Sequence, residues 1–104
     1  MQIHVPETIE HYEPTLRLFF DLMVFKLNLN RHKDDASEGY HPIDMFNLLD
    51  GEQKELRDAL IRESQGDVMF EAVDVANMAF LTSLYAGRLT KDEFENGRVN
   101  GAAK

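Results

Sequence analysis

Cysteine is absent from the 104-residue sequence, so disulfide bonds, thiolate metal ligands and a cysteine nucleophile are excluded. Basic residues are few, because eleven Lys and Arg stand against nineteen Asp and Glu, which gives a formal net charge of -8. A surface of this charge repels duplex DNA, anionic membranes and free phosphate compounds. A run of ~20 apolar residues and a secretory signal pattern are also missing. We therefore expect a soluble, cytoplasmic protein that binds neither nucleic acid nor membranes.

The length and the distribution of apolar residues predict one compact domain. Residues 1–12 carry little apolar periodicity, and we expect them to form an irregular N-terminal arm. Residues 13–96 are expected to form a single all-α domain, and residues 97–104 a flexible tail. No segment alternates between apolar and polar residues for long enough to indicate a strand.

Apolar residues recur at spacings of three and four in segments that predict helices at 14–31, 42–63 and 67–86. Their inward stripes are Leu16, Phe19, Phe20, Met23 and Leu27 in the first, and Ile43, Phe46, Leu49, Leu56, Ala59 and Leu60 in the second. A short fourth helix is expected at 90–96, and the polar segment 32–41 is expected to be a loop. The residues that delimit or interrupt these helices are Pro14, Pro42, Gly51, Asp67, Gly87 and Thr90.

The third predicted helix is apolar around most of its circumference. A bundle of three helices would leave much of that surface in contact with water. We therefore expect a homodimer or a homotetramer.

Two acidic pairs have the spacing that puts both carboxylates on one helix face: Glu52 with Glu55, and Glu71 with Asp74. Two antiparallel neighbouring helices could direct all four into one gap. Spacing alone is weak, because nineteen acids placed at random in 104 positions give about 3.5 such pairs.

The surroundings of Glu71 and Asp74 are more informative than their spacing. No Lys, Arg or His occurs from Glu63 through Gly87, so these carboxylates have no basic neighbour on their own helix. Buried carboxylates without a partner are costly, and the missing cation could come from solution. Oxygen ligands favour Mg²⁺ or Mn²⁺ over zinc.

A simpler interpretation remains open for both pairs. Glu71 and Asp74 could face solvent, or could pair with Arg57 or Arg62 from the second helix. The neighbours of Glu52 and Glu55 include Lys54, Arg57 and Asp58, which are typical of an ordinary charged surface.

The arrangement Glu52-x-x-Glu55, fifteen further residues and then Glu71-x-x-Asp74 resembles the metal signature of the MazG-like all-α nucleoside triphosphate pyrophosphohydrolases. The segments EQKELRDAL and FEAVDVANMAF are also similar to that family, and the resemblance covers residues 16–86. The segment KLNLNRHK at 26–33 is similar to an Asn-x-x-Lys segment of phage and bacterial members that act on purine deoxynucleotides, without the Gly and Trp that often follow it there.

The resemblance implies a dimeric or tetrameric helical bundle that hydrolyses a nucleoside triphosphate, most simply a deoxynucleotide, to the monophosphate and pyrophosphate. It makes Glu52, Glu55, Glu71 and Asp74 the ligands of Mg²⁺, with Mn²⁺ as a substitute. Glu52 or Glu55 would be the catalytic base. Asn77 would help to hold the metal or the substrate.

A cluster of basic and amide side chains at the end of the first predicted helix supplies candidates for substrate binding: Lys26, Asn30, His32 and Lys33. Their charges equally suit the negative end of the helix dipole, so both interpretations stay open. Tyr40 is a candidate for stacking on a base, whereas His4, His11 and His41 lack metal-ligand spacing and are expected at the surface.

A function of another class also fits the composition, namely a non-catalytic acidic interaction protein or DNA mimic. Such a protein would spread its acids over the exterior and would tolerate Asp74→Ala. A metal-dependent enzyme would lose metal binding with the same substitution.

Overall fold

A computed structural model describes residues 4–87 and residue 95. Its elements are η1 (Glu7–Tyr12), α1 (Glu13–Leu29), α2 (Arg31–Asp35), η2 (Ala36–Gly39), α3 (Pro42–Ile61) and α4 (Gln65–Tyr85). No strand occurs among these residues, so the expected all-α class is confirmed for the described part of the chain. The helix expected at 90–96 and the tail expected at 97–104 lie outside the described residues, apart from residue 95.

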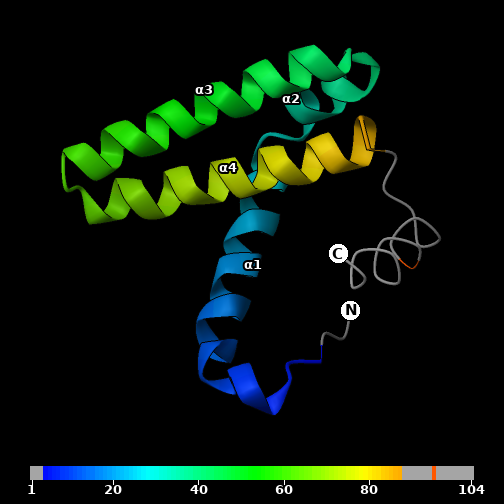
Figure 1. The fold of residues 1–104 in the computed structure, drawn as a ribbon. Coiled ribbons are helices and arrows are strands. Elements are labelled where there is room, and N and C mark those ends of the chain that lie inside the picture. The colour runs from blue at the N-terminus through cyan, green and yellow to red at the C-terminus, as the bar shows by residue number, and fades with distance from the viewer. Residues whose placement is uncertain (1–3, 88–94, 96–104) are drawn as a thin grey trace, which may run out of the picture.

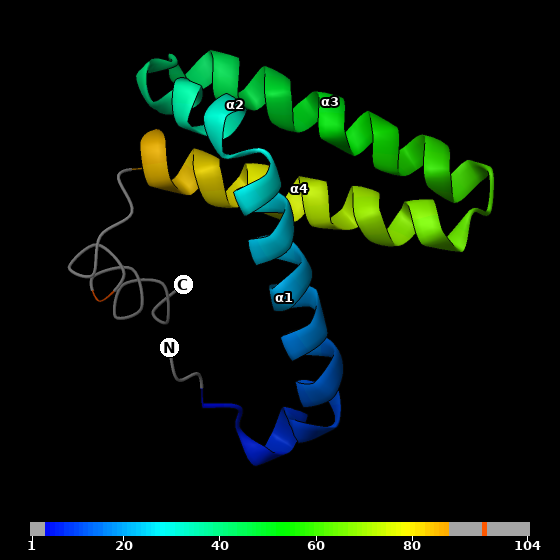
Figure 2. The same cartoon turned by 180° about the vertical axis from the view of Figure 1, so that it is seen from behind.

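The centre of the fold is an antiparallel hairpin of α3 and α4, which lie side by side along their lengths (Figure 1). Helix α1 crosses α4 near its middle, and the amino-terminal part of α1 runs away from the hairpin (Figures 1 and 2). The short elements α2 and η2 lead from α1 to the start of α3. Among the described long helices, α4 packs against both α3 and α1, whereas α1 packs against α4 alone.

Helices α1 and α3 begin where the sequence predicts, each with a proline in its first turn. Pro14 stands in the first turn of α1, and Pro42 in the first turn of α3. At the start of α3 the His41 side chain accepts a hydrogen bond from the Ile43 N–H (3.1 Å), and the Asp44 carboxylate accepts one from the His41 N–H (3.2 Å). Two otherwise unpaired backbone donors are thereby satisfied.

Two segments expected to be irregular are helical. The prediction of a loop at 32–41 is wrong, because α2 and η2 occupy most of it. Helices of one turn need no apolar stripe, and here a local bond supports them: the Ser37 hydroxyl donates to the Asp34 carbonyl at 2.6 Å. The N-terminal arm likewise contains the 3-10 helix η1, which is kinked at Ile9 (φ -124, ψ 17).

The connection between α3 and α4 differs from the expected break. Helix α4 begins at Gln65 with Ser64 in the N-cap position, so Asp67 lies inside the first turn and is not the cap. Glu63 adopts φ 57, the left-handed conformation that glycine normally supplies after a helix. Its N–H donates to the Leu60 carbonyl at 3.2 Å, and the Ser64 N–H donates to the Ala59 carbonyl at 3.3 Å. This pair of bonds closes α3 in a Schellman motif.

The core is small and belongs to the hairpin. The buried hydrophobic residues are Met45, Ala59, Val73, Met78 and Leu81. Helix α1 has no buried residue. Of the predicted inward stripes, α1 exposes Leu16 and Phe20, and α3 exposes Ile43, Phe46 and Leu60, so for these five positions the prediction of burial is wrong. The helices described in residues 4–87 are too few to cover them.

Helix α4 is long and apolar enough to cross a membrane by length and composition. An 18-residue window of this helix has a mean hydropathy of 1.2. Only 22% of that window is buried within the chain. The same helix carries Asp67, Glu71 and Asp74 and packs against α3 and α1. A core helix of a soluble protein passes the same test, so this property leaves the location of the protein undecided.

Candidate metal centre

The α3–α4 hairpin brings three of the predicted metal ligands together. Glu52 and Glu55 lie one turn apart on α3, and Glu71 lies on the antiparallel α4. Each offers a carboxylate oxygen, and these three oxygens lie within 4.8 Å of one another. We call these residues the acid triad. The i, i+3 spacing placed Glu52 and Glu55 on one face, and the packing of α4 against that face supplied Glu71.

The acid triad is partly withdrawn from water. Glu52 and Glu71 are half-buried, and Glu55 is exposed. One oxygen of Glu52 (Oε2) and one of Glu71 (Oε2) are buried without a hydrogen-bond partner in the described part of the chain. Buried carboxylate oxygens ordinarily accept a hydrogen bond or bind a cation. These two oxygens are therefore suited to a partner from outside the chain.

The electrostatics of the acid triad show a deficit of positive charge. Burial raises the pKa of Glu52 to about 7, and the charges of Glu55 and Asp74 add to the effect. Burial also raises the pKa of Glu71, followed by its hydrogen bond with Glu55 and the charges of Glu55 and Asp74. Lys26 acts in the opposite direction on Glu71 without cancelling these causes. A bound divalent cation would return both carboxyl groups to the ionised form.

The fourth predicted ligand, Asp74, lies outside the acid triad and has a partner of its own. Its Oδ1 is 2.6 Å from Nζ of Lys26 on α1, and both side chains are largely buried. The same Nζ is 5.7 Å from the centroid of the Phe70 ring, which adds a cation–π contact. Of the predicted alternatives, Arg62 lies 3.8 Å from Asp67 instead. The partner of Asp74 therefore comes from a helix that the sequence argument did not consider.

Asn77 is buried, with 6% of its surface exposed, and it connects α4 with α1. Its Nδ2 donates to the Met23 carbonyl at 3.1 Å. Its Oδ1 is buried without a hydrogen-bond partner among the described residues. Asn77 is thus a structural link between the two helices and still has one acceptor to offer.

The structure brings Lys26 to the acidic region, but not the other predicted substrate ligands. Asn30 is half-buried at the start of α2, and His32 and Lys33 are exposed on α2. No hydrogen bond or ion pair joins these three side chains to the acid triad within residues 4–87.

Tyr40 is exposed and lines a shallow pocket of about 360 Å³ with Asp44, Asn47 and Leu48. This pocket contains no member of the acid triad. His4 and His11 are exposed as expected, and His41 has the capping role already described.

Asp34 is a member of the acidic region that the sequence argument missed. It lies on α2, and burial raises its pKa, with the charges of Asp35 and Asp74 adding to the effect and Lys33 opposing it. Asp34 has no i, i+3 acidic partner and stands in a segment without apolar periodicity, so no sequence signal pointed to it.

The acid triad offers the donor set that Mg²⁺ or Mn²⁺ prefers. Both ions are hard, take oxygen ligands and keep several waters, so a few carboxylates on one side are sufficient. The two unpartnered Oε2 atoms fit this requirement. Comparison with known proteins adds no relative: no family model, no curated protein and no solved structure matches this chain.

Proposed function

We propose that the protein is a Mg²⁺-dependent nucleoside triphosphate pyrophosphohydrolase, which converts a nucleoside triphosphate, preferably a deoxynucleotide, to the monophosphate and pyrophosphate. The observation that carries this proposal is the acid triad, in which three carboxylate oxygens converge within 4.8 Å. The resemblance of the two acidic motifs to the MazG-like family supplies the substrate class. An acidic mimic would gain nothing from half-buried carboxylates that face one another, so the convergence favours the enzyme.

The charge of the substrate explains why a cation is required. A triphosphate is strongly anionic at neutral pH, and the acid triad would repel it. When bound, the divalent cation neutralises this repulsion and polarises the phosphoryl oxygens. The chain's own task is to hold that cation on one side, through Glu52 and Glu71, whose buried oxygens have no competing protein donor among the described residues.

Glu55 is our candidate for the catalytic base. It is the exposed member of the acid triad, so water reaches its carboxylate directly. In the proposed reaction a water oxygen bonds to the α-phosphorus, a water proton passes to the Glu55 carboxylate, and the bond from the α-phosphorus to the oxygen that bridges to the β-phosphate breaks. Pyrophosphate leaves with the electron pair of that bond.

Lys26 is our candidate for a phosphate contact. Its ammonium group lies at the acidic region, bound to Asp74 at 2.6 Å. The ammonium group has three N–H donors, so it can bind a triphosphate oxygen while it keeps Asp74 as a partner. In this proposal Asn77 Oδ1 binds the metal or the substrate. Asn30, His32 and Lys33 contact the part of the substrate that lies farthest from the acid triad.

The proposal also covers the oligomeric state and the location of the protein. We propose a homodimer or homotetramer, because large hydrophobic side chains are exposed on α1, α3 and α4. A cytoplasmic location fits the absence of cysteine.

The test is an assay of pyrophosphate release from a panel of nucleoside and deoxynucleoside triphosphates. Activity is expected with Mg²⁺ and not with a chelator. Glu55→Gln should lower turnover by roughly 10²-fold or more, the contribution typical of a general base. The matched control is Asp58→Asn, which removes one exposed charge from the same helix outside the acid triad and should leave turnover unchanged. The absence of turnover for every triphosphate would contradict the proposal.

A further inference from the structure

Helix α1 lacks the packing that a helix of its length needs. It has 17 residues and no buried residue. Isolated helices of this length are marginal in water, and most helical stability in proteins comes from packing one apolar face. Figures 1 and 2 show that only its carboxyl-terminal part crosses the hairpin. The amino-terminal part therefore requires a further contact that the described part of one chain does not supply.

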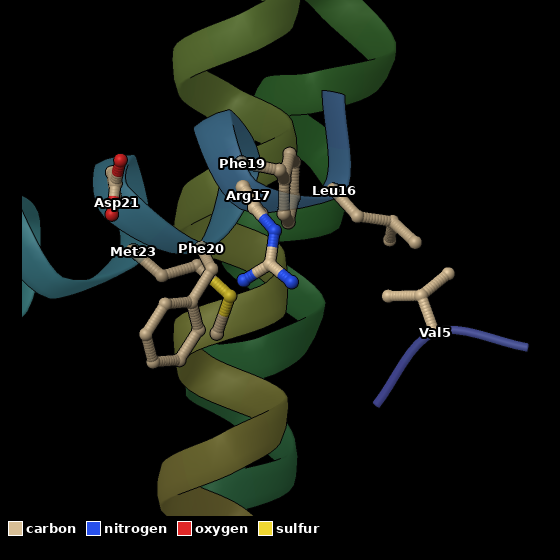
Figure 3. Close-up of a pocket in the computed structure, with 7 residues that line it drawn as sticks. All are labelled: Val5, Leu16, Arg17, Phe19, Phe20, Asp21 and Met23. Carbon is tan, nitrogen blue, oxygen red and sulfur yellow. The ribbon is translucent and has the colours of Figure 1, made fainter. Parts of the chain in front are cut away.

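The unpacked part of α1 presents a continuous apolar row. Leu16, Phe20 and Val24 follow one another at four-residue spacing and expose 47%, 38% and 49% of their surfaces. Leu16 and Phe20 belong to the lining of a hollow of about 530 Å³ that also includes Val5, Phe19 and Met23. Figure 3 shows the Arg17 guanidinium among these apolar side chains, with Val5 facing Leu16. Such a hollow is suited to receive the side chains of another helix.

The charge of α1 distinguishes it from the rest of the molecule. Its four charged residues are Glu13, Arg17, Asp21 and Lys26, so α1 is neutral, whereas α3 and α4 each carry a net charge of -3. Two copies of a chain with a net charge of -8 repel each other over most of their surfaces. Contact through α1 avoids this repulsion, and contact through the exposed faces of α3 or α4 does not.

The order of charges on α1 is also complementary to itself. Arg17 and Asp21 lie one turn apart on the flank of the apolar row. When two identical helices pair in antiparallel fashion about a two-fold axis, the same flank of each meets. With the axis near residue 19, Arg17 of one copy faces Asp21 of the other, and the reverse pair forms as well. Within one chain the exposed Arg17 guanidinium contacts Glu13 at 2.7 Å, and its remaining N–H donors have no other partner among the described residues, so they can bind a second carboxylate.

We propose that α1 is the self-association surface of the protein, where it pairs antiparallel with α1 of a second copy. Leu16 and Phe20 of each copy pack against the apolar lining of the hollow on the other copy, and the two Arg17–Asp21 pairs fix the register. Because α1 also carries Lys26 and the Met23 carbonyl, this contact holds in place the helix that supports Asp74 and Asn77. The proposal does not depend on metal binding or catalysis.

The test exploits the two-fold symmetry. Sedimentation equilibrium is measured for the wild type, for Arg17→Glu, for Asp21→Arg, and for an equimolar mixture of these two variants. Each single variant places two like-charge pairs in its own dimer, and we expect the dissociation constant to rise roughly tenfold or more. The wild type should have the mass of a dimer or tetramer, and each single variant half of it at a concentration between the two constants.

The mixture restores the charge complementarity that each variant alone has lost. The glutamate introduced by Arg17→Glu in one chain meets the arginine introduced by Asp21→Arg in the other, and the second pair is the native Arg17–Asp21 contact. Association in the mixture should therefore return towards the wild-type value.

Two controls separate this interface from general effects. Lys54→Glu alters an exposed i, i+4 ion pair on α3 (Lys54 to Asp50, 3.1 Å) and should leave association unchanged. Far-UV circular dichroism checks that every variant remains helical, and the mixture is compared with the same two variants measured separately. A monomeric wild type, single variants that associate as the wild type does, or a mixture no tighter than its components would each overturn the proposal.

Discussion

Replacing Glu52 with glutamine should stabilise the metal-free protein above neutral pH and greatly reduce the stabilisation that Mg²⁺ gives. The folded chain raises the pKa of Glu52 to about 7, chiefly through burial, against an ordinary value of 4.5. Because the folded pKa is the higher one, the contribution of Glu52 to stability is fully present below pH 4.5 and is lost as the pH rises through 7. The wild type without metal should therefore lose stability over this interval, and Glu52→Gln should not.

The size of the effect follows from the shift. The rise in the pKa of Glu52 from 4.5 to about 7 corresponds to about 3 kcal/mol of folding free energy. Because Glu52 is partly in contact with solvent, we expect a loss of stability of about 1–2 kcal/mol. For a chain of this length, that difference raises the melting temperature of Glu52→Gln above that of the wild type by roughly 5–10 °C at about pH 8 without metal. At about pH 5 the two proteins should differ little.

The assay is thermal unfolding followed by circular dichroism, at about pH 5 and about pH 8, with a chelator or with saturating Mg²⁺. Mg²⁺ at about 100 times its dissociation constant adds about 2.7 kcal/mol to the wild type. It should add much less to Glu52→Gln, which has lost a ligand. Asp58→Asn serves as the control for removing a negative charge from α3. A variant less stable than the wild type at the higher pH without metal, or stabilised equally by Mg²⁺, would refute the reasoning.

Two further predictions concern single contacts. Lys26→Met keeps most of the apolar stem but leaves the largely buried Asp74 carboxylate without its cation, so the free energy of unfolding in urea should fall by about 1–3 kcal/mol at neutral pH. Glu63→Gly relieves a side chain held at φ 57 and should raise the free energy of unfolding by about 0.5–1 kcal/mol; a decrease would show that the Glu63 side chain has a stabilising contact.

Local rules predicted the long helices and most of the acidic region. Pro14 and Pro42 marked two helix starts, and the spacing of Glu52 and Glu55 placed both on the face of α3 that meets α4. These features depend only on helix periodicity and on the antiparallel packing of neighbouring helices.

The features that sequence reasoning missed depend on contacts between distant segments. The Lys26–Asp74 pair forms because α1 crosses α4 at one particular level, and no periodicity specifies that level. Asp34 is brought in by a helix of five residues, too short to show an apolar pattern. The end of α3 was obscured because a glutamate, and not a glycine, occupies its left-handed position. The predicted burial of the α1 stripe assumed a complete bundle, which residues 4–87 do not form by themselves.

The most direct test of the account is a crystal structure of the protein soaked with Mn²⁺, examined for anomalous scattering. We expect an anomalous peak between α3 and α4, in direct contact with carboxylate oxygens of Glu52 and Glu71 and beside the Glu55 carboxylate. Metal–oxygen distances near about 2.1–2.2 Å would identify these oxygens as ligands. A structure in which the three carboxylates turn away from one another, with no peak between them at saturating Mn²⁺, would contradict the metal centre and the enzymatic proposal that depends on it.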